Sequence, residues 1–326
     1  MDDPQQHAQP LQPFMGFSAH DMLMTGLRIM YTEKRINNVN GNPHESKTNN
    51  QRFKDHYGAS CYVMADIWRD MQIFSFDLLP CPENPIIHPK KLAIEYFLEA
   101  AHFLYRYKRE CEREALFDKS PKTLRTHCWY YLQRIQALKS HKIVFPVSRQ
   151  GDDVWLLSVD GTHCRINDPT HPEFSQDSKY FSHKWNHAAL NYELGVSLFE
   201  SKILWINGPF PAGTNDNKVF ADYGLKEKLR ELGMKAVADK GYNGHPEQCS
   251  TFNAYDSEPV KMLKARAQMR HEQVNGIIHE FQSMDDCFRH GEEKHKICFE
   301  AVCVITQYRM DHGEQLYDVL AGIKEI

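Results

Sequence analysis

The chain has 326 residues, of which 41% are hydrophobic and 25% are charged, and its formal net charge is −4. This composition is typical of a soluble globular protein and leaves room for two domains. No stretch approaches the ~20 consecutive apolar residues that a transmembrane helix needs. The acidic, Gln/Pro-rich start lacks the basic and apolar segments of a secretory signal. Nine scattered cysteines without a CxxC pair indicate reduced thiols in a cytosolic or nuclear protein.

Residues 1–50 are predicted to form a flexible N-terminal segment that contains one helix and an Asn-rich linker. The helix is indicated by apolar residues at helical spacing, namely Met22, Leu23, Leu27, Ile29 and Met30. The stretch "NNVNGNPHESKTNNQ", residues 37–51, is polar and rich in turn-forming residues, which is typical of a loop between packed segments.

Residues 51–150 have helical periodicity and are expected to form an all-α, helix-turn-helix-like region. The stretch 52–71 predicts a short helix, a turn at Gly58 and a second helix; a Pro-rich connection over 78–91 and a long helix over 92–104 follow. Further on, Ser120 is a good N-cap and Pro121 a good first helical residue. Helix, three-residue turn and second helix is the spacing of a helix-turn-helix.

The N-terminal end of that second helix carries candidate DNA contacts. Such motifs enter the major groove with this end first, and Lys122, Thr123 and Arg125 lie there with hydrogen-bond donors. Residues 88–149 hold 13 Lys/Arg against six Asp/Glu, which leaves a net charge of −11 for the rest of the chain. This asymmetry suits a protein that binds phosphate with one part and metal with another, although a solvated helical face would have the same composition.

Residues 151–326 have a different pattern, in which strands come first and helices follow. Strands are predicted over 153–161, 188–199, 202–210 and 234–242, with a possible short fifth strand over 260–263; helices are predicted over 215–232, 264–284 and 295–310. Three antiparallel strands, a helix, a strand and further helices are the order of a ribonuclease-H-like α/β layer. We therefore predict a mixed sheet flanked by helices.

Two aspartates follow apolar strands of this predicted sheet. Asp160 closes the run "VWLLSVD" and Asp239 closes "KAVAD", and a glycine follows each within two residues. An isolated Asp-Gly is usually a hairpin turn, but glycine also lets the backbone turn and leave the carboxylate exposed at a strand end. Ligands of α/β sheets bind at this edge. Two carboxylates on neighbouring strands, ~5 Å apart, would share a cation that relieves their repulsion.

A third carboxylate is expected from the helix predicted over 264–284. Glu272 lies at the margin of its apolar stripe, with Asn275 on the same face, and Glu280 is the alternative. A helical glutamate is usually a solvated surface residue; the order of the elements is what promotes Glu272. Oxygen-only ligands select Mg²⁺ or Mn²⁺. Two such ions support in-line displacement at phosphorus.

Five segments, in this order along the chain, resemble the DDE transposases of the PIF/Harbinger type, and more narrowly the DDE endonuclease-domain proteins common in protist and algal genomes. They are "LLSVDGTHCRI", "SHKWNHAALNYELGV", "WINGPFPAGTNDNKVF", "VADKGYNG" and "RHEQVNGIIHEF" with "FRHGEEKHKICFEAVCVITQ". The resemblance covers residues 51–320. It implies Asp160, Asp239 and Glu272 as the catalytic and metal-binding triad. Such relatives cut DNA at the terminal inverted repeats of their element and join the 3′ ends to target DNA.

The resemblance also bears on partners and on further residues. It implies a nuclear protein that acts as a homodimer on DNA, because two element ends are brought together, and it allows a separate Myb-like DNA-binding partner. Arg266 and Arg270 are candidates for phosphate contacts. Asp216 matches an acidic position of similar sequences, although we interpret it first as the N-cap of the helix that follows.

A cluster near the C-terminal end invites a zinc site but is interpreted as core. His290, His295, Cys298 and Cys303 match no common zinc spacing, and the two cysteines fall on an apolar helical stripe.

The sequence thus predicts a two-metal DNA endonuclease or transposase. One alternative is a domesticated, catalytically silent descendant that still binds DNA. The other is a small-molecule phosphodiesterase or plain nuclease with the same metals; the basic helical region argues against the small-molecule version.

Overall fold

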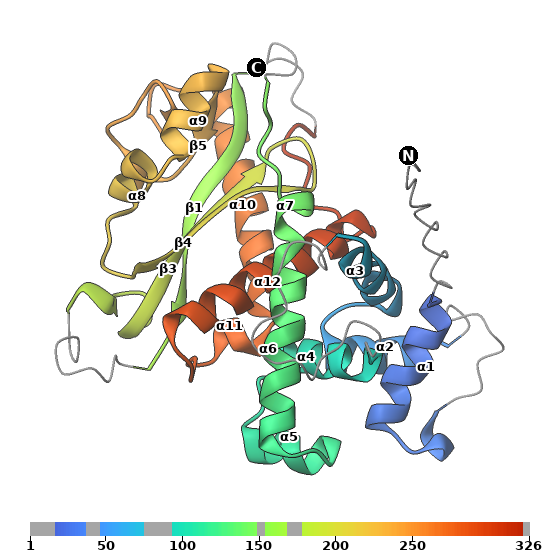
Figure 1. The fold of residues 1–326 in the computed structure, drawn as a ribbon. Helices are drawn as coiled ribbons and strands as arrows, with labels where there is room; N and C mark the ends of the chain where they lie inside the picture. The colour runs from blue at the N-terminus through green and yellow to red at the C-terminus, as the bar shows by residue number, and fades with distance from the viewer. Residues whose placement is uncertain (1–16, 37–45, 75–92, 149–153, 168–177, 322–326) are drawn as a thin grey trace, which may run out of the picture.

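The computed structural model describes residues 17–36, 46–74, 93–148, 154–167 and 178–321 (Figure 1). Within these ranges a helical region is followed by a mixed β-sheet with helices on both faces, which confirms the predicted fold class. The predicted Pro-rich connection and residues 37–45 of the predicted linker lie outside the described residues. No helix in the described part of the chain is both long and apolar enough to cross a membrane.

The helical region is built from short helices whose ends follow the predicted signals. Its elements are α1 (Ala19–Met30), η1 (Glu33–Arg35), α2 (Lys47–Tyr57), α3 (Cys61–Phe74), α4 (Ile94–Arg106), α5 (Glu110–Phe117), α6 (Pro121–Ala137) and α7 (Lys139–Lys142). Gly58 ends α2 with φ 79°, a conformation that costs glycine little. The end of the predicted linker is helical instead, because Ser46 caps α2 and Phe53 and Tyr57 bury its inner face.

The predicted helix-turn-helix spacing is present. Three residues, 118–120, separate α5 from α6, and the Ser120 side chain accepts a hydrogen bond from Thr123 N at 3.3 Å. Pro121 occupies the first turn of α6. The N-terminal end of α6 lies beside α5, at the end of the helix away from the sheet (Figure 1).

The sheet comprises β1 (Trp155–Arg165), β2 (Phe181–Ser182), β3 (His187–Ser197), β4 (Ile203–Pro211), β5 (Lys235–Val237) and β6 (Cys249–Ser250). β1 lies between an antiparallel β3 and a parallel β5, β4 pairs with β3, and β6 pairs with β5. The possible strand over 260–263 is wrong. Those residues belong to a helix that has Pro259 in its first turn, and β6 supplies the additional strand.

Helices cover the two faces of the sheet. On one face α8 (Asp216–Asp222) and α9 (Leu225–Leu232) pack on β1 through a cluster that includes Leu157, Val159 and Phe220. On the other face lie α10 (Glu258–His279), α11 (Gln282–Asp285) and α12 (Glu292–Asp311). Two short 3₁₀ turns, η4 (Ser178–Tyr180) and η5 (Lys240–Tyr242), complete the described elements.

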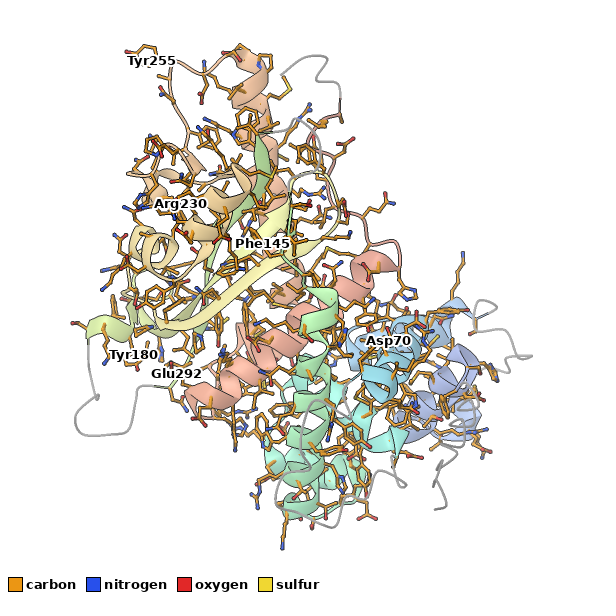
Figure 2. All side chains as sticks on the ribbon, turned by 45° about the horizontal axis from the view of Figure 1, so that its top comes forward. Asp70, Phe145, Tyr180, Arg230, Tyr255 and Glu292 are labelled. Carbon is orange, nitrogen blue, oxygen red and sulfur yellow. The ribbon has the colours of Figure 1, made fainter. Side chains whose placement is uncertain are left out.

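A single hydrophobic cluster joins the helical region to the sheet. It runs from α1, α3 and α4 through α6 and α12 to the inner side chains of β3, among them Tyr192 and Leu194. Side chains fill the space between the sheet and the helical region, where Asp70 lies on α3 (Figure 2). Asp70 accepts a 2.8 Å hydrogen bond from Tyr308 on α12. The boundary predicted at residue 150 stays a prediction, since the core is continuous across it.

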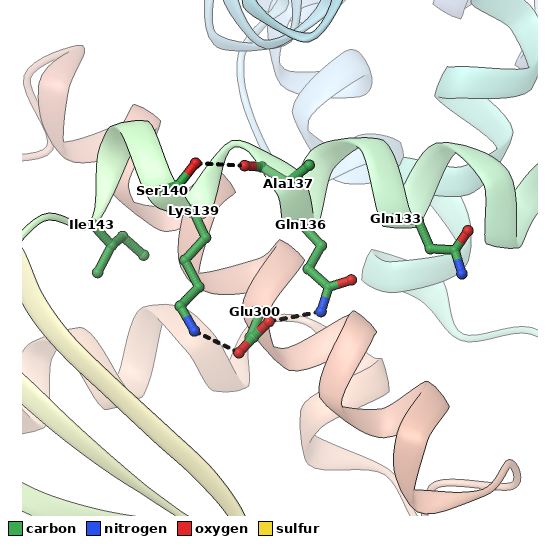
Figure 3. A pocket seen from close by; sticks show the side chains of 7 residues that line it. All are labelled: Gln133, Gln136, Ala137, Lys139, Ser140, Ile143 and Glu300. Atoms are coloured by element: carbon green, nitrogen blue, oxygen red, sulfur yellow. Dashed lines mark hydrogen bonds and ion pairs between the residues drawn. The ribbon is translucent and has the colours of Figure 1, made fainter. Parts of the chain in front are cut away.

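The buried carboxylate of Glu300 on α12 forms hydrogen bonds to α6 and α7. Glu300 is 5% exposed, and its two oxygens accept hydrogen bonds from Gln136 Nε2 at 2.7 Å and Lys139 Nζ at 2.6 Å (Figure 3). Gln133, Ser140 and Ile143 line the small pocket beside this contact. Both oxygens of Glu300 are therefore partnered, as a buried carboxylate requires.

We expect Glu300→Gln to lower the free energy of unfolding by about 1–2 kcal/mol, because Lys139 loses its charged acceptor while the shape is kept. Urea unfolding followed by circular dichroism measures the change. Glu110→Gln is the matched control: Glu110 pairs with Arg125 on the exposed surface, where such pairs contribute less than about 1 kcal/mol. Equal destabilisation by both variants would contradict the assigned role of Glu300.

Candidate active site

Asp160 lies within β1 and not at its end. The ladder between β1 and β3 continues past it to the pair Arg165 and Ala189, so the Asp-Gly sequence makes no turn and the predicted strand end is wrong. The parallel ladder to β5, however, stops at the pair Ser158 and Val237. The edge of β1 that faces β5 is consequently unpaired at Asp160, as it would be at a strand end, until Phe288 pairs with this edge through Arg165 O and Asn167 N.

Two hydrogen bonds between β1 and α10 flank Asp160. Ser158, Asp160 and Thr162 lie on one face of the strand because side chains alternate. Ser158 Oγ lies 3.1 Å from Nδ1 of His271, and Thr162 Oγ1 lies 3.2 Å from Nε2 of His279. Asp160 is thus held at the interface of β1 and α10.

Asp239 lies just beyond β5, at the same level as Asp160. It is two residues past Val237, as Asp160 is two residues past Ser158, the paired residue of the parallel strand. Its Oδ1 accepts a hydrogen bond from Gly241 N at 2.8 Å, and Oδ1 of Asp160 accepts one from Gly161 N at 2.8 Å. The predicted placement of Asp239 after a strand beside β1 is confirmed.

Asp216 joins these carboxylates and does not cap its helix. Asn215 is the N-cap of α8 and accepts a hydrogen bond from Asn217 N at 2.9 Å, so the interpretation of Asp216 as the cap is wrong. Asp216 Oδ1 instead accepts a hydrogen bond from Asn191 Nδ2 on β3 at 3.0 Å. It approaches β1 where Gly161 has no side chain: a Cβ there would lie 3.0 Å from Asp216 Oδ1.

The electrostatics of Asp160 show which acids surround it. Burial and, in decreasing order, the charges of Asp239, Asp216 and Glu272 raise its pKa to about 7, against the lowering effect of the hydrogen bond from Gly161. Burial, followed by the charge of Asp239, likewise raises the pKa of Asp216. Among the described residues, no Lys, Arg or His forms an ion pair with any of these four carboxylates. The site concentrates negative charge that the described part of the protein does not neutralise.

The two candidate third acids have different surroundings. Glu272 is exposed on α10, one residue after the buried His271, and its charge acts on Asp160. Glu280 lies two turns further along, where its Oε2 pairs with Nη2 of the buried Arg309 at 2.8 Å. The geometry therefore favours Glu272 over Glu280.

The donor set fits a hard divalent cation, since carboxylate oxygens are the ligands that Mg²⁺ and Mn²⁺ prefer. Within the described ranges, no three His, Cys, Asp or Glu side chains converge closely enough to hold a metal ion as they stand. In the C-terminal cluster, His295, Cys298 and Cys303 are buried in the core as expected.

Comparison with known families shows a similarity in this part of the chain. Residues 159–307, a little under half of the chain, match the family model of the DDE superfamily endonuclease. The matched segment contains Asp160, Asp216, Asp239 and Glu272. No curated protein and no solved structure matches the chain.

The predicted DNA contacts on α6 lie outside the matched segment and remain predictions. Lys122 is exposed at the N-terminal end of α6. Arg125 is also exposed, and its Nη1 donates to both oxygens of Glu110 at 3.0 Å. Thr123 takes part in the helix cap, where its Oγ1 lies 2.9 Å from Ser120 Oγ.

The two arginines on α10 donate hydrogen bonds to backbone carbonyl oxygens of the protein itself. Arg270 is 3% exposed and donates hydrogen bonds to three carbonyl oxygens, those of Ser197, Tyr317 and Glu200. Arg266 donates to the carbonyl oxygens of Val319 and Ala321. A phosphate reaches Arg270 only if these bonds break; the phosphate contacts predicted for Arg266 and Arg270 stay predictions.

The sequence analysis did not identify the buried polar residues that lie beside these acids. Asn191 and Glu193 project from β3 toward the α8 face, and Trp205 Nε1 donates to Glu193 Oε2 at 2.8 Å. Tyr242, in η5, is buried; burial and then the charges of Glu193 and the nearby aspartates raise its pKa. Two polar residues at alternate positions of the apolar stretch 188–199 were the available signal.

We expect Arg270→Ala to destabilise the protein by about 2–4 kcal/mol, because three carbonyl oxygens lose a charged donor that is itself buried. Denaturant unfolding measures the loss. DNA affinity per folded molecule should stay within about twofold of the wild type. A stable variant with weakened DNA binding would instead restore Arg270 as a phosphate contact.

Proposed function

We propose that this protein is a metal-dependent DNA endonuclease of the transposase type. The observation that carries the proposal is the crowding of Asp239, Asp216 and Glu272 around Asp160 at the open edge between β1 and β5. The match to the DDE endonuclease family model implies DNA as the substrate class. The finer proposal is a PIF/Harbinger-type enzyme that cuts at transposon ends, joins them to target DNA, works as a nuclear homodimer and allows a Myb-like partner.

In this proposal Asp160, Asp239 and Glu272 hold Mg²⁺ or Mn²⁺. Two such ions, when bound, activate the attacking oxygen and stabilise the leaving oxygen of an in-line displacement at phosphorus. The chain itself supplies orientation: the amides of Gly161 and Gly241 each fix one oxygen of Asp160 and Asp239. Ser158 and Thr162 hold β1 against α10, which carries Glu272.

We expect Asp160→Asn, Asp239→Asn and Glu272→Gln each to lower Mn²⁺-dependent DNA cleavage by about 10²-fold or more, because each removes a charge from the site. Cleavage of DNA that carries the flanks of the gene, followed on gels, measures the effect. Glu280→Gln is the matched control on the same helix and should keep wild-type cleavage.

Two outcomes would contradict the proposal in different ways. Loss of cleavage in Glu280→Gln but not in Glu272→Gln would make Glu280, and not Glu272, the third acid. A wild-type protein that binds DNA in Mn²⁺ without cutting it would point to the catalytically silent, DNA-binding descendant.

In this proposal the helical region contacts the DNA phosphates, and these contacts should make DNA affinity depend on the salt concentration. Each phosphate contact contributes about 0.9 to the slope of log affinity against log salt concentration. We expect Lys122→Ala and Arg125→Ala each to make the slope shallower by about 1. Arg230→Ala is the control, since Arg230 is exposed on α9 and away from α6 (Figure 2). Unchanged slopes in the α6 variants would exclude this end of α6 as a site of phosphate contacts.

A further inference from the structure

Asp216 and Glu272 approach Asp160 from opposite faces of the sheet. Glu272 belongs to α10, which packs on the face that Ser158 and Thr162 share with Asp160. Asp216 belongs to α8, on the face of Gly161, Asn191 and Glu193. The charges of both act on Asp160, that of Asp216 more strongly. The acids thus divide into two groups that share Asp160.

Asp216 also lies beside Asp239. A Cβ placed on Gly241 would lie 2.9 Å from Asp239 Oδ1 and 3.6 Å from Asp216 Oδ2, so both oxygens surround the same point. Gly161 leaves room in the same way, since its Cβ would lie 3.0 Å from Asp216 Oδ1. The absence of side chains at these two positions lets Asp216 approach the ends of β1 and β5 closely, because a side chain at either position would crowd the carboxylate oxygens.

A buried amide oxygen without a donor lies beside Gly161 and Asp216. Asn191 is 2% exposed, and Nδ2 is bound to Asp216, but Oδ1 has no hydrogen-bond partner among the described residues. This oxygen lies 2.9 Å from the position of a Cβ on Gly161. An unpartnered buried acceptor costs about 1–3 kcal/mol. A cation, or a water molecule bound to one, would supply the missing partner.

We propose that Asp216, oriented by Asn191, is a fourth cation ligand of the site and forms, with Asp160 and Asp239, a position for a divalent cation on the α8 side of β1. The cation is a hard one, Mg²⁺ or Mn²⁺, because every donor is oxygen. Glu272 then serves the other position, on the α10 side. This inference rests on the proposed function, which it deepens by giving each of the two cations its own acid.

Mn²⁺ binding to the full-length protein tests the proposal without any cleavage reaction. Free Mn²⁺ is measured by electron paramagnetic resonance during titration, and the wild type should bind two ions per chain. Asp216→Asn should weaken one of them by about 10-fold or more and leave the other. Gly161→Ala should do the same without a change of charge, because its methyl group would crowd Asp216 Oδ1 and Asn191 Oδ1.

The control for net charge is Asp222→Asn, since Asp222 is exposed on the same helix, and it should bind two ions as the wild type does. Circular dichroism without Mn²⁺ verifies that each variant is folded. Two ions bound with wild-type affinity in both Asp216→Asn and Gly161→Ala would overturn this inference alone, provided that Asp160→Asn loses Mn²⁺. Unchanged binding in Asp160→Asn would overturn the proposed function as well.

Discussion

The burial of α12 on every side is the constraint on which the two halves of the structure depend. From Cys298 to Met310 each of its side chains is buried. It packs against α3, α6 and α7 on one side and against β4 and α10 on the other. Removal of either side would expose an apolar face that no other described element covers. The helical region and the sheet therefore stabilise each other through one shared helix.

Polar side chains on α12 fix the register of this packing. Glu300 and Tyr308 bind the helical region, through Lys139 and Asp70. Gln307 faces the sheet, where it accepts from Ile203 N at 2.8 Å and donates to the carbonyl oxygen of Ser201 at 3.1 Å. Hydrophobic burial alone would allow the helix to slide or rotate. Buried hydrogen bonds to both neighbours make other positions costly, because each slip would leave polar atoms without partners.

The sequence predicted those features that follow from local pattern. Asp239 follows an apolar strand and precedes a glycine by two residues, and the turn at Gly58 and the cap of α6 are local signals as well. Asp160 was found for a partly wrong reason, because only the length of the neighbouring β5 decides where the edge of β1 opens. Asp216 was misread because either Asn215 or Asp216 can cap a helix, and the contact to Asn191 on β3 decides between them. The burial of Arg270 depends on carbonyl groups at 197, 200 and 317, which local pattern cannot bring together.

The length of α6 has a geometric consequence for any DNA that the protein holds. Its 17 residues span about 25 Å at 1.5 Å per residue, and its N-terminal end is the one away from the sheet. Duplex DNA rises about 3.4 Å per base pair, so this helix is as long as roughly seven base pairs. If one duplex contacts both the N-terminal end of α6 and the edge between β1 and β5, the length of α6 contributes a fixed part of the distance between the bases that are read and the phosphate that is cut. The cut would then lie at a constant offset from the recognised sequence.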